Sequence, residues 1–270
     1  MKALILAAGE GSRLRPLTLT RPKPMLPVGG KPLLEHIIQL LRRCGITSIA
    51  INLHYKPAVI PSYFEDGHLW GVEITYSLEE TLLGSAGAAK RLQHYFDETF
   101  VVFYGDLYTE MDLSPLVGFH REKRAQITVA LYEVDNPCAC GIVDLAADGR
   151  IRRFVEKPAP HEVFSNLANA GIYIVEPGVL DYVPPEQPYD FGRDMFPRLL
   201  AEGVDVWGYP IHDLLIDIGT PAKYQEAQRI CQSREPWILD LGVDLSHSPP
   251  RTSPWEVEGA QANCEHLVQT

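Results

Sequence analysis

The sequence predicts an α/β fold: a doubly wound, Rossmann-like mixed sheet with an α+β portion attached to it. Short apolar strand patterns alternate with helical patterns up to about residue 135, which is typical of sheets built with right-handed crossovers. Hairpin and short-strand patterns then replace this alternation between residues 136 and 233. The chain has 270 residues, of which 46% are hydrophobic, and this is enough to bury a substantial core.

In the first half, strands and helices are expected to alternate. Lys2–Ala8 is a nearly continuous apolar run, as in a buried parallel strand. Leu33–Leu41 carries apolar residues at helical spacing, and Gly45 behind it is suited to end a helix. The same two periodicities predict strands at 48–53, 72–77, 100–104 and 126–133, and helices at 57–66, 84–96 and 114–123.

In the second half, short strands surround turns. A turn at Ala147–Gly149 separates two apolar runs and predicts a hairpin of 142–145 with 151–155. Thr220–Pro221 is suited to an N-cap and first helical position, and opens a last helix to about Ser233. Further strands are expected at 171–175, 205–209 and 214–217, and a further helix at 193–202.

These patterns predict one domain, residues 1–233, with two halves at 1–135 and 136–233. Residues 234–270 differ in composition, with no lysine, four prolines and a net charge of −4. Such a composition is typical of a loosely ordered or peripheral segment. We therefore expect an acidic, proline-containing C-terminal tail.

Cysteine usage and apolar patterns predict a cytoplasmic protein. The chain has 5 cysteines, and Cys138-x-Cys140 lacks the spacing of a zinc-binding pair. Free thiols in a reducing compartment are the simplest interpretation. No apolar run approaches the ~20 residues that a membrane span needs. The run at 3–8 is too short for the core of a signal peptide.

The charge is unevenly distributed. The net charge is −11, which argues against a general nucleic-acid binder. Residues 1–32 nevertheless hold six basic side chains against Glu10 alone, a net charge of +5 that leaves −16 for the rest of the chain. This positive cluster is either a solvated basic surface or a local anion-binding site.

The positive cluster surrounds a glycine-rich loop behind the first strand. Gly9 and Gly11 leave bare backbone N–H groups where a ligand can approach closely. Arg13 adds a fork of donors for phosphate oxygens, and Lys23 adds a mobile point charge. Leu14 stands where a dinucleotide fingerprint needs its third glycine, and the ending of a Walker A loop is missing. A nicotinamide-dependent oxidoreductase is therefore disfavoured.

Six segments occur in the order found in one enzyme family. The glycine-rich loop continues into Arg21-Pro-Lys-Pro-Met-Leu-Pro-Val28. The other five are Leu83-Gly-Ser-Ala-Gly-Ala88, Tyr104-Gly-Asp106, Phe154-Val-Glu-Lys-Pro158, Asn169-Ala-Gly-Ile-Tyr173 and Asp217-Ile-Gly-Thr-Pro221. Together they resemble the signatures of the sugar-1-phosphate nucleotidylyltransferases, also called nucleoside-diphosphate-sugar pyrophosphorylases, over residues 1–232.

The resemblance implies a GT-A-like nucleotidyltransferase fold and a reaction. A nucleoside triphosphate and a sugar 1-phosphate would give a nucleotide sugar and pyrophosphate by in-line attack on the α-phosphorus, with Mg²⁺ as cofactor. Residues 1–135 would bind the nucleotide, and residues 136–233 the sugar phosphate. These two small molecules are the expected partners. No nucleic acid or membrane is expected, and a homo-oligomer is an expectation from the resemblance alone.

The resemblance also assigns roles to individual residues. Arg13 is expected to bind the leaving pyrophosphate, and Lys23 to contact the α-phosphate or the sugar phosphate, so both are catalytic candidates. Asp106 and Asp217 are expected to hold Mg²⁺. The residues expected to bind the nucleotide are Ala8, Gly9, Gly11, Ser12, Arg13, Glu79, Glu80 and Gly84. Those expected to bind the sugar phosphate are Gly141, Glu156, Lys157 and Asn169, with Asn166 as a competitor of Asn169.

The sequence leaves open which nucleotide base and which sugar the protein would bind. Leu78 stands near a position where several family members carry a glutamine, whose amide hydrogen bonds leucine cannot replace. Glu79 or Glu80 would accept from the N1–H and amine of guanine, or both are simply solvent-exposed. Ile51-Asn-Leu-His-Tyr55 is similar to a segment of mannose-1-phosphate guanylyltransferases. GTP and mannose 1-phosphate are therefore preferred over UTP or dTTP with glucose 1-phosphate or another sugar phosphate.

A non-catalytic alternative exists on the same fold. A nucleotide-sugar-binding regulatory subunit could lose its catalytic side chains without losing its structure. Arg13, Lys23 and Asp106 are all present, which favours the enzyme.

Overall fold

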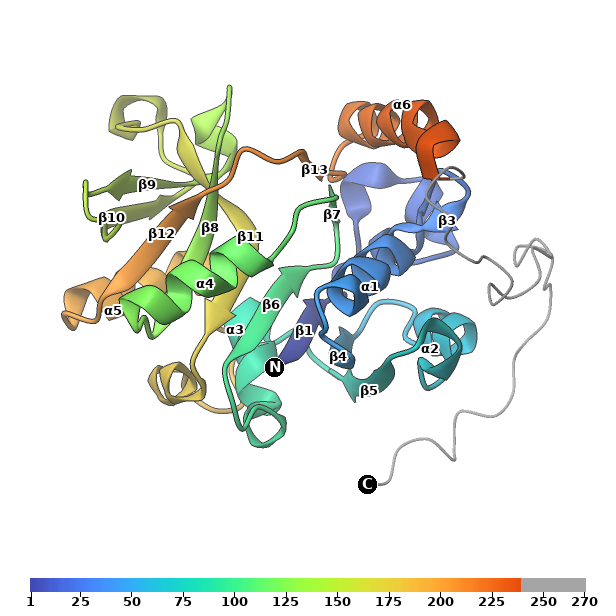
Figure 1. Ribbon diagram of the computed structural model, residues 1–270, viewed down its shortest axis with the longest axis horizontal. Coiled ribbons are helices and arrows are strands. Elements are labelled where there is room, and N and C mark those ends of the chain that lie inside the picture. Colours follow the sequence, from blue (N-terminus) through green and yellow to red (C-terminus); the bar gives the residue numbers. More distant parts are fainter. Residues whose placement is uncertain (239–270) are drawn as a thin grey trace.

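The structure is a computed structural model that describes the backbone of residues 1–238 and the side chains of residues 1–233 (Figure 1). Its main strands are β1 (Lys2–Leu6), β4 (Ser48–Leu53), β5 (Glu73–Leu78), β6 (Phe100–Tyr104), β8 (Ile127–Glu133), β9 (Gly141–Leu145), β10 (Ile151–Glu156), β11 (Leu167–Val175) and β12 (Val206–Pro210). They form one sheet in the order β10-β9-β11-β6-β1-β4-β5, to which β8 and β12 are joined through β11. This mixed sheet confirms the predicted α/β class.

Four strands of the first half, β1, β4, β5 and β6, form a parallel part of this sheet. β1 pairs in parallel with β4 and β6, and β4 pairs in parallel with β5. In this register, Leu6 is opposite both Asn52 and Tyr104, so the carboxyl ends of these strands meet at one edge. Ligands of open α/β sheets bind at that edge, and the glycine-rich loop follows β1 there.

Apolar side chains pack on both faces of the sheet. Ala3 and Ile5 of β1 belong to one buried cluster, together with residues of α1 (Leu33–Arg43). Leu4 belongs to a second buried cluster, with residues of α3 (Gly84–Arg91) and α5 (Phe196–Ala201). Successive side chains of a strand point to opposite faces, so this division confirms the doubly wound arrangement. The other helices of the first half are α2 (Val59–Phe64) and α4 (Ser114–Lys123).

The second half reverses direction within the sheet. β11 runs antiparallel to β6 and β8, β12 runs parallel to β8, and β9 and β10 form the predicted hairpin. β11 begins at Leu167, before its expected start at Gly171. The register with β8 is irregular between Asn169 and Tyr173, and φ is +72° at Gly171. This bulge interrupts the two-residue periodicity by which the strand would be recognised.

Two helices have bounds different from those expected. The expected helix 84–96 ends as α3 at Arg91 and is followed by a 3₁₀ turn. The expected helix 193–202 begins earlier, as a π-helical turn at Phe191–Met195 that leads into α5. Its early start has a local cause, because the carboxylate of Asp190 accepts from the N–H groups of two residues in this turn.

Two small ladders and a last helix complete the fold. β2 (Pro27–Val28) pairs with β3 (Lys31–Pro32), and β7 (Leu107–Thr109) pairs with β13 (Leu215–Asp217). α6 (Pro221–Ile238) lies beside β2 and β13. It continues past its expected end at Ser233, so the expected boundary of the tail falls inside a helix. Residues 239–270 lie outside the described part of the chain.

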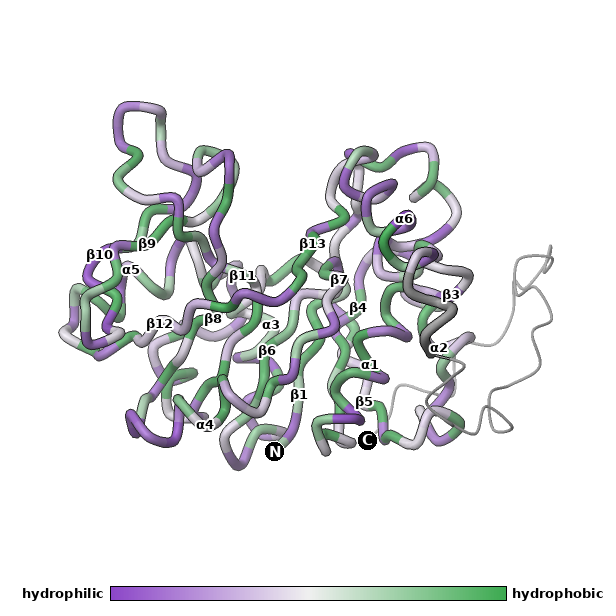
Figure 2. Tube along the Cα trace, turned by 45° about the horizontal axis from the view of Figure 1, so that its top comes forward, coloured by the Kyte–Doolittle hydropathy of each residue, from purple (hydrophilic) through white to green (hydrophobic). Residues whose placement is uncertain are grey.

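The hydropathy of the trace follows this architecture. Figure 2 shows hydrophobic stretches along the central strands and hydrophilic stretches in many connecting loops. Along residues 1–238, no helix has the length and apolarity that crossing a bilayer requires.

Candidate functional site

Asp106 and Asp217 meet through a short antiparallel ladder. Asp106 follows β6 at the carboxyl edge of the sheet, and Asp217 ends β13, which pairs with β7. The N–H of Ile218 donates to the carbonyl of Asp106 at 3.0 Å. At Gly105, a Cβ atom would lie 2.7 Å from the carbonyl oxygen of Leu6, so glycine is needed where the chain passes this close to β1. The expected pair of carboxylates is thus brought together.

The ammonium group of Lys23 lies between these carboxylates. Its Nζ donates to Asp106 Oδ2, and to Asp217 Oδ1 at 3.2 Å. Lys23 itself is only 8% exposed. Burial raises the pKa of Asp106, an effect that the charge of Lys23 opposes and the charge of Asp217 reinforces. The lysine therefore offsets the repulsion between two carboxylates in a partly desolvated place.

Gly219 leaves open the space around which this cluster is arranged. A Cβ atom there would lie 2.9 Å from Asp217 Oδ1, 3.0 Å from Arg13 Nη2 and 3.1 Å from Lys23 Nζ. The N–H of Gly219 also donates to Asp217 Oδ1 at 2.8 Å. The structure therefore brings both expected catalytic residues to the expected metal ligands. Sequence reasoning gave Gly219 no role, although it lies within the matched Asp217–Pro221 segment.

The donor set of this cluster fits a magnesium ion. Mg²⁺ is usually held by one or two carboxylates together with water and substrate phosphates. Asp106 and Asp217 supply two such carboxylates, and both already face one positive charge on Lys23. Among the side chains of residues 1–233, no group of three or more His, Cys, Asp or Glu residues forms a metal cage.

The glycine-rich loop has the openness expected of it. Gly9 is exposed, and a Cβ atom there would meet nothing within 4 Å. At Gly11, φ is +65° and a Cβ atom would lie 3.0 Å from Lys23 Cβ, so glycine allows the loop to turn against the lysine. Ala8 is buried, whereas Ser12 and Arg13 are exposed on the following 3₁₀ turn. Their contact with a nucleotide remains a prediction.

The structure corrects the expectation for Glu79. This residue is only 2% exposed, so its side chain is not exposed to solvent and not accessible to a base. Its Oε1 accepts from Asn52 Nδ2 at 2.8 Å, and its Oε2 accepts from the N–H of Leu83 at 2.9 Å. A carboxylate enclosed in this way is not presented to a base. Glu80 is exposed and remains the candidate that reads guanine.

Gly84 has a packing role at the start of α3. Its φ is +71°, and a Cβ atom would lie 2.6 Å from the carbonyl oxygen of Tyr189. The same carbonyl accepts from the N–H groups of Ala86 and Gly87 at 3.0 and 2.9 Å. The second half of the chain thus closes over the first turn of α3 and satisfies two of its N–H groups.

Glu156 lies in a second cluster, in which its carboxylate packs against the backbone of Gly141 and Gly192 beside Lys157; we call this the Glu156 cluster. Its Oε2 lies where Cβ atoms on Gly141 and Gly192 would come within 2.5 and 2.8 Å. Burial raises the pKa of Glu156, while the neighbouring charge of Lys157 lowers it. Lys157 Nζ lies 3.8 Å from Glu156 Oε1, and its side chain is 68% exposed. Gly141, Glu156 and Lys157 are therefore adjacent as expected, and Gly192 is an addition that the sequence did not indicate.

Asn169 is held by a buried hydroxyl group. Its Nδ2 donates to the hydroxyl of Tyr173 at 2.8 Å, and its Oδ1 accepts from the N–H of Gly171 at 2.9 Å. Tyr173 is fully buried and is hydrogen-bonded in turn to Tyr104. Both tyrosines lie in segments that resemble the family signatures, and this resemblance is the only feature of the sequence that points to them. The competing residue, Asn166, is exposed.

The thiol of Cys140 lies within electrostatic reach of both clusters. Burial raises the pKa of Cys140, and the carboxylates of Asp217 and Glu156 act in the same direction. One of these carboxylates belongs to the lysine-centred cluster and the other to the Glu156 cluster. Both clusters therefore lie near Cys140.

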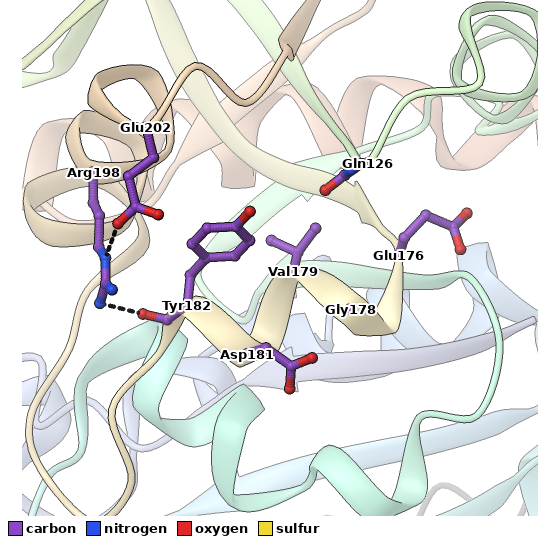
Figure 3. Close-up of a pocket in the computed structure, with 8 residues that line it drawn as sticks. All are labelled: Gln126, Glu176, Gly178, Val179, Asp181, Tyr182, Arg198 and Glu202. Carbon is purple, nitrogen blue, oxygen red and sulfur yellow. Dashed lines mark hydrogen bonds and ion pairs between the residues drawn. The ribbon is translucent and has the colours of Figure 1, made fainter.

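A separate hollow lies beyond β11. It is lined by Gln126, Glu176, Gly178, Val179, Asp181, Tyr182, Arg198 and Glu202 (Figure 3). Arg198 donates to Glu202 Oε1 at 2.8 Å and to the carbonyl of Tyr182 at 2.7 Å. The guanidinium of Arg198 is thus hydrogen-bonded to other residues that line the hollow. None of the expected site residues lines this hollow.

Comparisons with known proteins point to one family. The family model described as nucleotidyl transferase matches residues 2–234. A UTP–glucose-1-phosphate uridylyltransferase of Synechocystis is 42% identical over 249 residues, which cover 87% of this chain and 64% of that protein. A mannose-1-phosphate guanylyltransferase of Mycobacterium tuberculosis is 38% identical over 224 residues, which cover 82% and 62%. The chain thus spans less than two thirds of the length of these relatives.

Solved structures share the fold. HddC from Yersinia pseudotuberculosis, complexed with GMP-PN, has a TM-score of 0.72 at 26% identity, and the match covers 85% of this chain and 98% of that one. A UDP-glucose pyrophosphorylase complexed with UDP-glucose has a TM-score of 0.75 at 22% identity, and the match covers 86% and 98%. On the family match and the two sequence relatives, this chain belongs to the nucleotidyl transferase family.

Proposed function

We propose that this protein transfers a nucleotidyl group from a nucleoside triphosphate to a sugar 1-phosphate and releases pyrophosphate. The observation that carries the proposal is the meeting of Arg13, Lys23, Asp106 and Asp217 around Gly219. In-line attack by a sugar phosphate oxygen on the α-phosphorus needs no covalent enzyme intermediate. It depends on positioning and on charge stabilisation, and this cluster can supply both.

The two cations have separate roles in this proposal. Lys23 donates to the α-phosphate as negative charge builds there, and Arg13 holds the leaving pyrophosphate with its guanidinium fork. Mg²⁺ bound by Asp106 and Asp217 would neutralise charge on the phosphate oxygens. Lys23 is buried and Arg13 is exposed, which suits a fixed contact for Lys23 and a contact that forms on substrate binding for Arg13.

The Glu156 cluster is proposed to bind the sugar 1-phosphate. Lys157 offers an exposed ammonium group to the phosphate, and Glu156 offers a carboxylate to a sugar hydroxyl. Gly141 lets this carboxylate lie directly against the backbone, where a Cβ atom would come within 2.5 Å of Glu156 Oε2. Asn169 presents the remaining N–H of its amide, since the other is donated to Tyr173.

For the substrates, we prefer GTP and mannose 1-phosphate. The name of the Mycobacterium tuberculosis relative supports this choice, and Glu80 is the glutamate of the pair whose side chain is accessible to a base. UTP or dTTP with glucose 1-phosphate is the second candidate, because the Synechocystis relative, at 42% identity, is named a uridylyltransferase. The intact cluster of Arg13, Lys23 and Asp106 supports an enzyme over a regulatory subunit. A cytoplasmic location is part of this proposal.

A product screen tests the proposal. The protein and Mg²⁺ would be incubated with GTP, UTP, dTTP, CTP or ATP, each with mannose 1-phosphate, glucose 1-phosphate or a related sugar phosphate. Mass spectrometry of the products should show one dominant nucleotide sugar. GDP-mannose as the main product would support the guanine contact proposed for Glu80. A UDP- or dTDP-sugar would support the proposed reaction but contradict the preference for guanine. Folded protein that makes no nucleotide sugar from any pair would overturn the proposed activity.

Gly219→Ala is expected to lower kcat/KM about a hundredfold, because a methyl group would occupy the space shared by Arg13, Lys23 and Asp217. Gly118→Ala is the matched control, since a Cβ atom at Gly118 meets nothing within 4 Å. Both variants would be compared with the wild type by steady-state kinetics and by thermal unfolding. Equal losses in the two variants would contradict the role given to this space.

Tyr173→Phe is expected to raise KM for the sugar 1-phosphate about tenfold, because the Asn169 amide loses the hydroxyl that orients it. KM for the nucleoside triphosphate should stay within about twofold. Tyr182→Phe, in the separate hollow, is the control. A rise of the same size in both KM values would show that Tyr173 supports the fold as a whole rather than the sugar site.

A further inference from the structure

A buried polar bridge joins the glycine-rich loop to the segment ahead of α3. Asn52, at the end of β4, is 3% exposed, and Glu79, directly after β5, is 2% exposed. The N–H of Ala7 donates to Asn52 Oδ1 at 2.7 Å. Asn52 Nδ2 donates to Glu79 Oε1 at 2.8 Å, and the N–H of Leu83 donates to Glu79 Oε2 at 2.9 Å. The bridge therefore runs from one backbone N–H to another.

The identities of the two side chains follow from this arrangement. Both ends of the bridge are N–H groups, which can only donate. An asparagine contributes one acceptor and one donor towards its neighbours, and an ionised glutamate contributes acceptors only. With Asn52 and Glu79, every donor meets an acceptor. Two amides in these places would leave one pair of donors facing each other, whichever way each amide is turned.

The bridge fixes two segments that the proposed function uses. Ala7 leads directly into Ala8 and Gly9, and Leu83 leads directly into Gly84. β1, β4 and β5 bring these segments to the same edge of the sheet (Figure 1). A ring nitrogen of His54 also lies 2.8 Å from the carbonyl oxygen of Glu79, so the glutamate is held on its backbone as well.

We propose that Asn52 and Glu79 are positioning residues, which set the spacing between the glycine-rich loop and the Leu83–Gly84 segment for the nucleoside triphosphate. This inference rests on the proposed function, because it takes those two segments as the walls of the nucleotide site. Neither side chain contacts the substrate. Their buried hydrogen bonds act on it through the backbone of Ala7 and Leu83.

Each single exchange should disturb the nucleotide site. In Glu79→Gln, the side-chain volume is unchanged but one buried donor has no acceptor. In Asn52→Asp, two carboxylates face each other. We expect each change to raise KM for the nucleoside triphosphate about tenfold, the size of effect produced by one unsatisfied buried group. KM for the sugar 1-phosphate should change by less than about twofold, since that site lies in the second half of the chain.

The two exchanges together should restore the site. In the double variant N52D/E79Q, the carboxylate at position 52 accepts from the N–H of Ala7 and from the amide at position 79. The carbonyl oxygen of that amide accepts from the N–H of Leu83. Every donor again has an acceptor, with the same number of atoms in the same space. We expect KM for the nucleoside triphosphate to return to within about threefold of the wild-type value.

The experiment compares the wild type, both single variants and the double variant, with separate KM values for the two substrates and a thermal unfolding curve for each. E122Q and N136D, at exposed positions, are matched controls and should behave as the wild type. If a single variant does not fold, Asn52→Ala takes its place, because it breaks the bridge without making two donors face each other.

The outcomes separate the two proposals. A wild type that makes no nucleotide sugar contradicts the proposed function itself. An active wild type with unchanged nucleotide KM in the single variants, or with both KM values raised equally, overturns the positioning role. A double variant that regains its unfolding temperature but not its nucleotide KM overturns it as well. A selective rise that the double variant reverses supports it.

Discussion

The Asp106→Asn variant is expected to lose about a thousandfold in kcat while staying folded. Asparagine keeps the size of the side chain but removes one of the two carboxylates proposed to hold Mg²⁺. Burial raises the pKa of Asp106, which means that the folded environment favours the uncharged form of this group. A neutral amide should therefore not lower the free energy of unfolding. We expect the variant to lose activity while its stability is unchanged.

The measurement is kcat at saturating substrates over a series of Mg²⁺ concentrations, together with the thermal unfolding temperature. Asp205→Asn makes the same chemical change at an exposed carboxylate, which lies 3.3 Å from Arg150 Nη1, and should leave both quantities close to the wild type. Turnover of Asp106→Asn within about tenfold of the wild type would remove Asp106 from the catalytic machinery.

The parts of the site that the sequence could predict are those set by strand ends. Asp106 follows a continuous apolar run, and Gly9 follows another, so parallel pairing of the two strands places both at one edge of the sheet. This inference needs only the type and direction of each strand. The same reasoning reaches Asn52 at the end of β4, but it does not say what the side chain contacts.

The parts that could not be predicted depend on how loops close over the sheet edge. Glu79 follows β5, and the sequence leaves it either in contact with the base or exposed to solvent, yet the turn to Leu83 folds back and encloses its carboxylate. Gly219 has Arg13 and Lys23 as neighbours because β13 pairs with β7. Lys23 and Asp217 are 194 residues apart, and no periodicity in the sequence links them.

Lys23→Met is expected to lower the free energy of unfolding by about 2 kcal/mol near neutral pH. Methionine has a similar length, but it leaves the Asp106 and Asp217 carboxylates facing each other without the ammonium group. The deficit should depend on pH. The loss of Lys23 removes the largest influence that lowers the pKa of Asp106, so this pKa rises further in the variant.

The sign of that dependence follows from proton binding. A carboxyl group whose pKa is higher in the folded state than in the unfolded state binds protons more tightly when folded, so stability falls as the pH rises through that pKa. The deficit of Lys23→Met relative to the wild type should therefore be small near pH 4 and grow towards pH 7. Urea unfolding at several pH values measures it, and a deficit independent of pH would mean that packing rather than charge is lost.

The same variant separates two roles of Lys23, because the ammonium group and a metal ion would share the same two carboxylates. Without the lysine, Mg²⁺ alone should raise the unfolding temperature more than it does in the wild type, since binding stabilises the folded state by mass action. The double variant K23M/D106N should lose this extra response. Yet kcat of Lys23→Met should stay about a hundredfold low at saturating Mg²⁺, because the α-phosphate has lost its donor. Tighter metal binding together with slower turnover is a combination that only a lysine acting on both the carboxylates and the phosphate would produce. A wild type whose unfolding temperature rises as much as that of the variant on adding Mg²⁺, or more, would contradict this pair of roles.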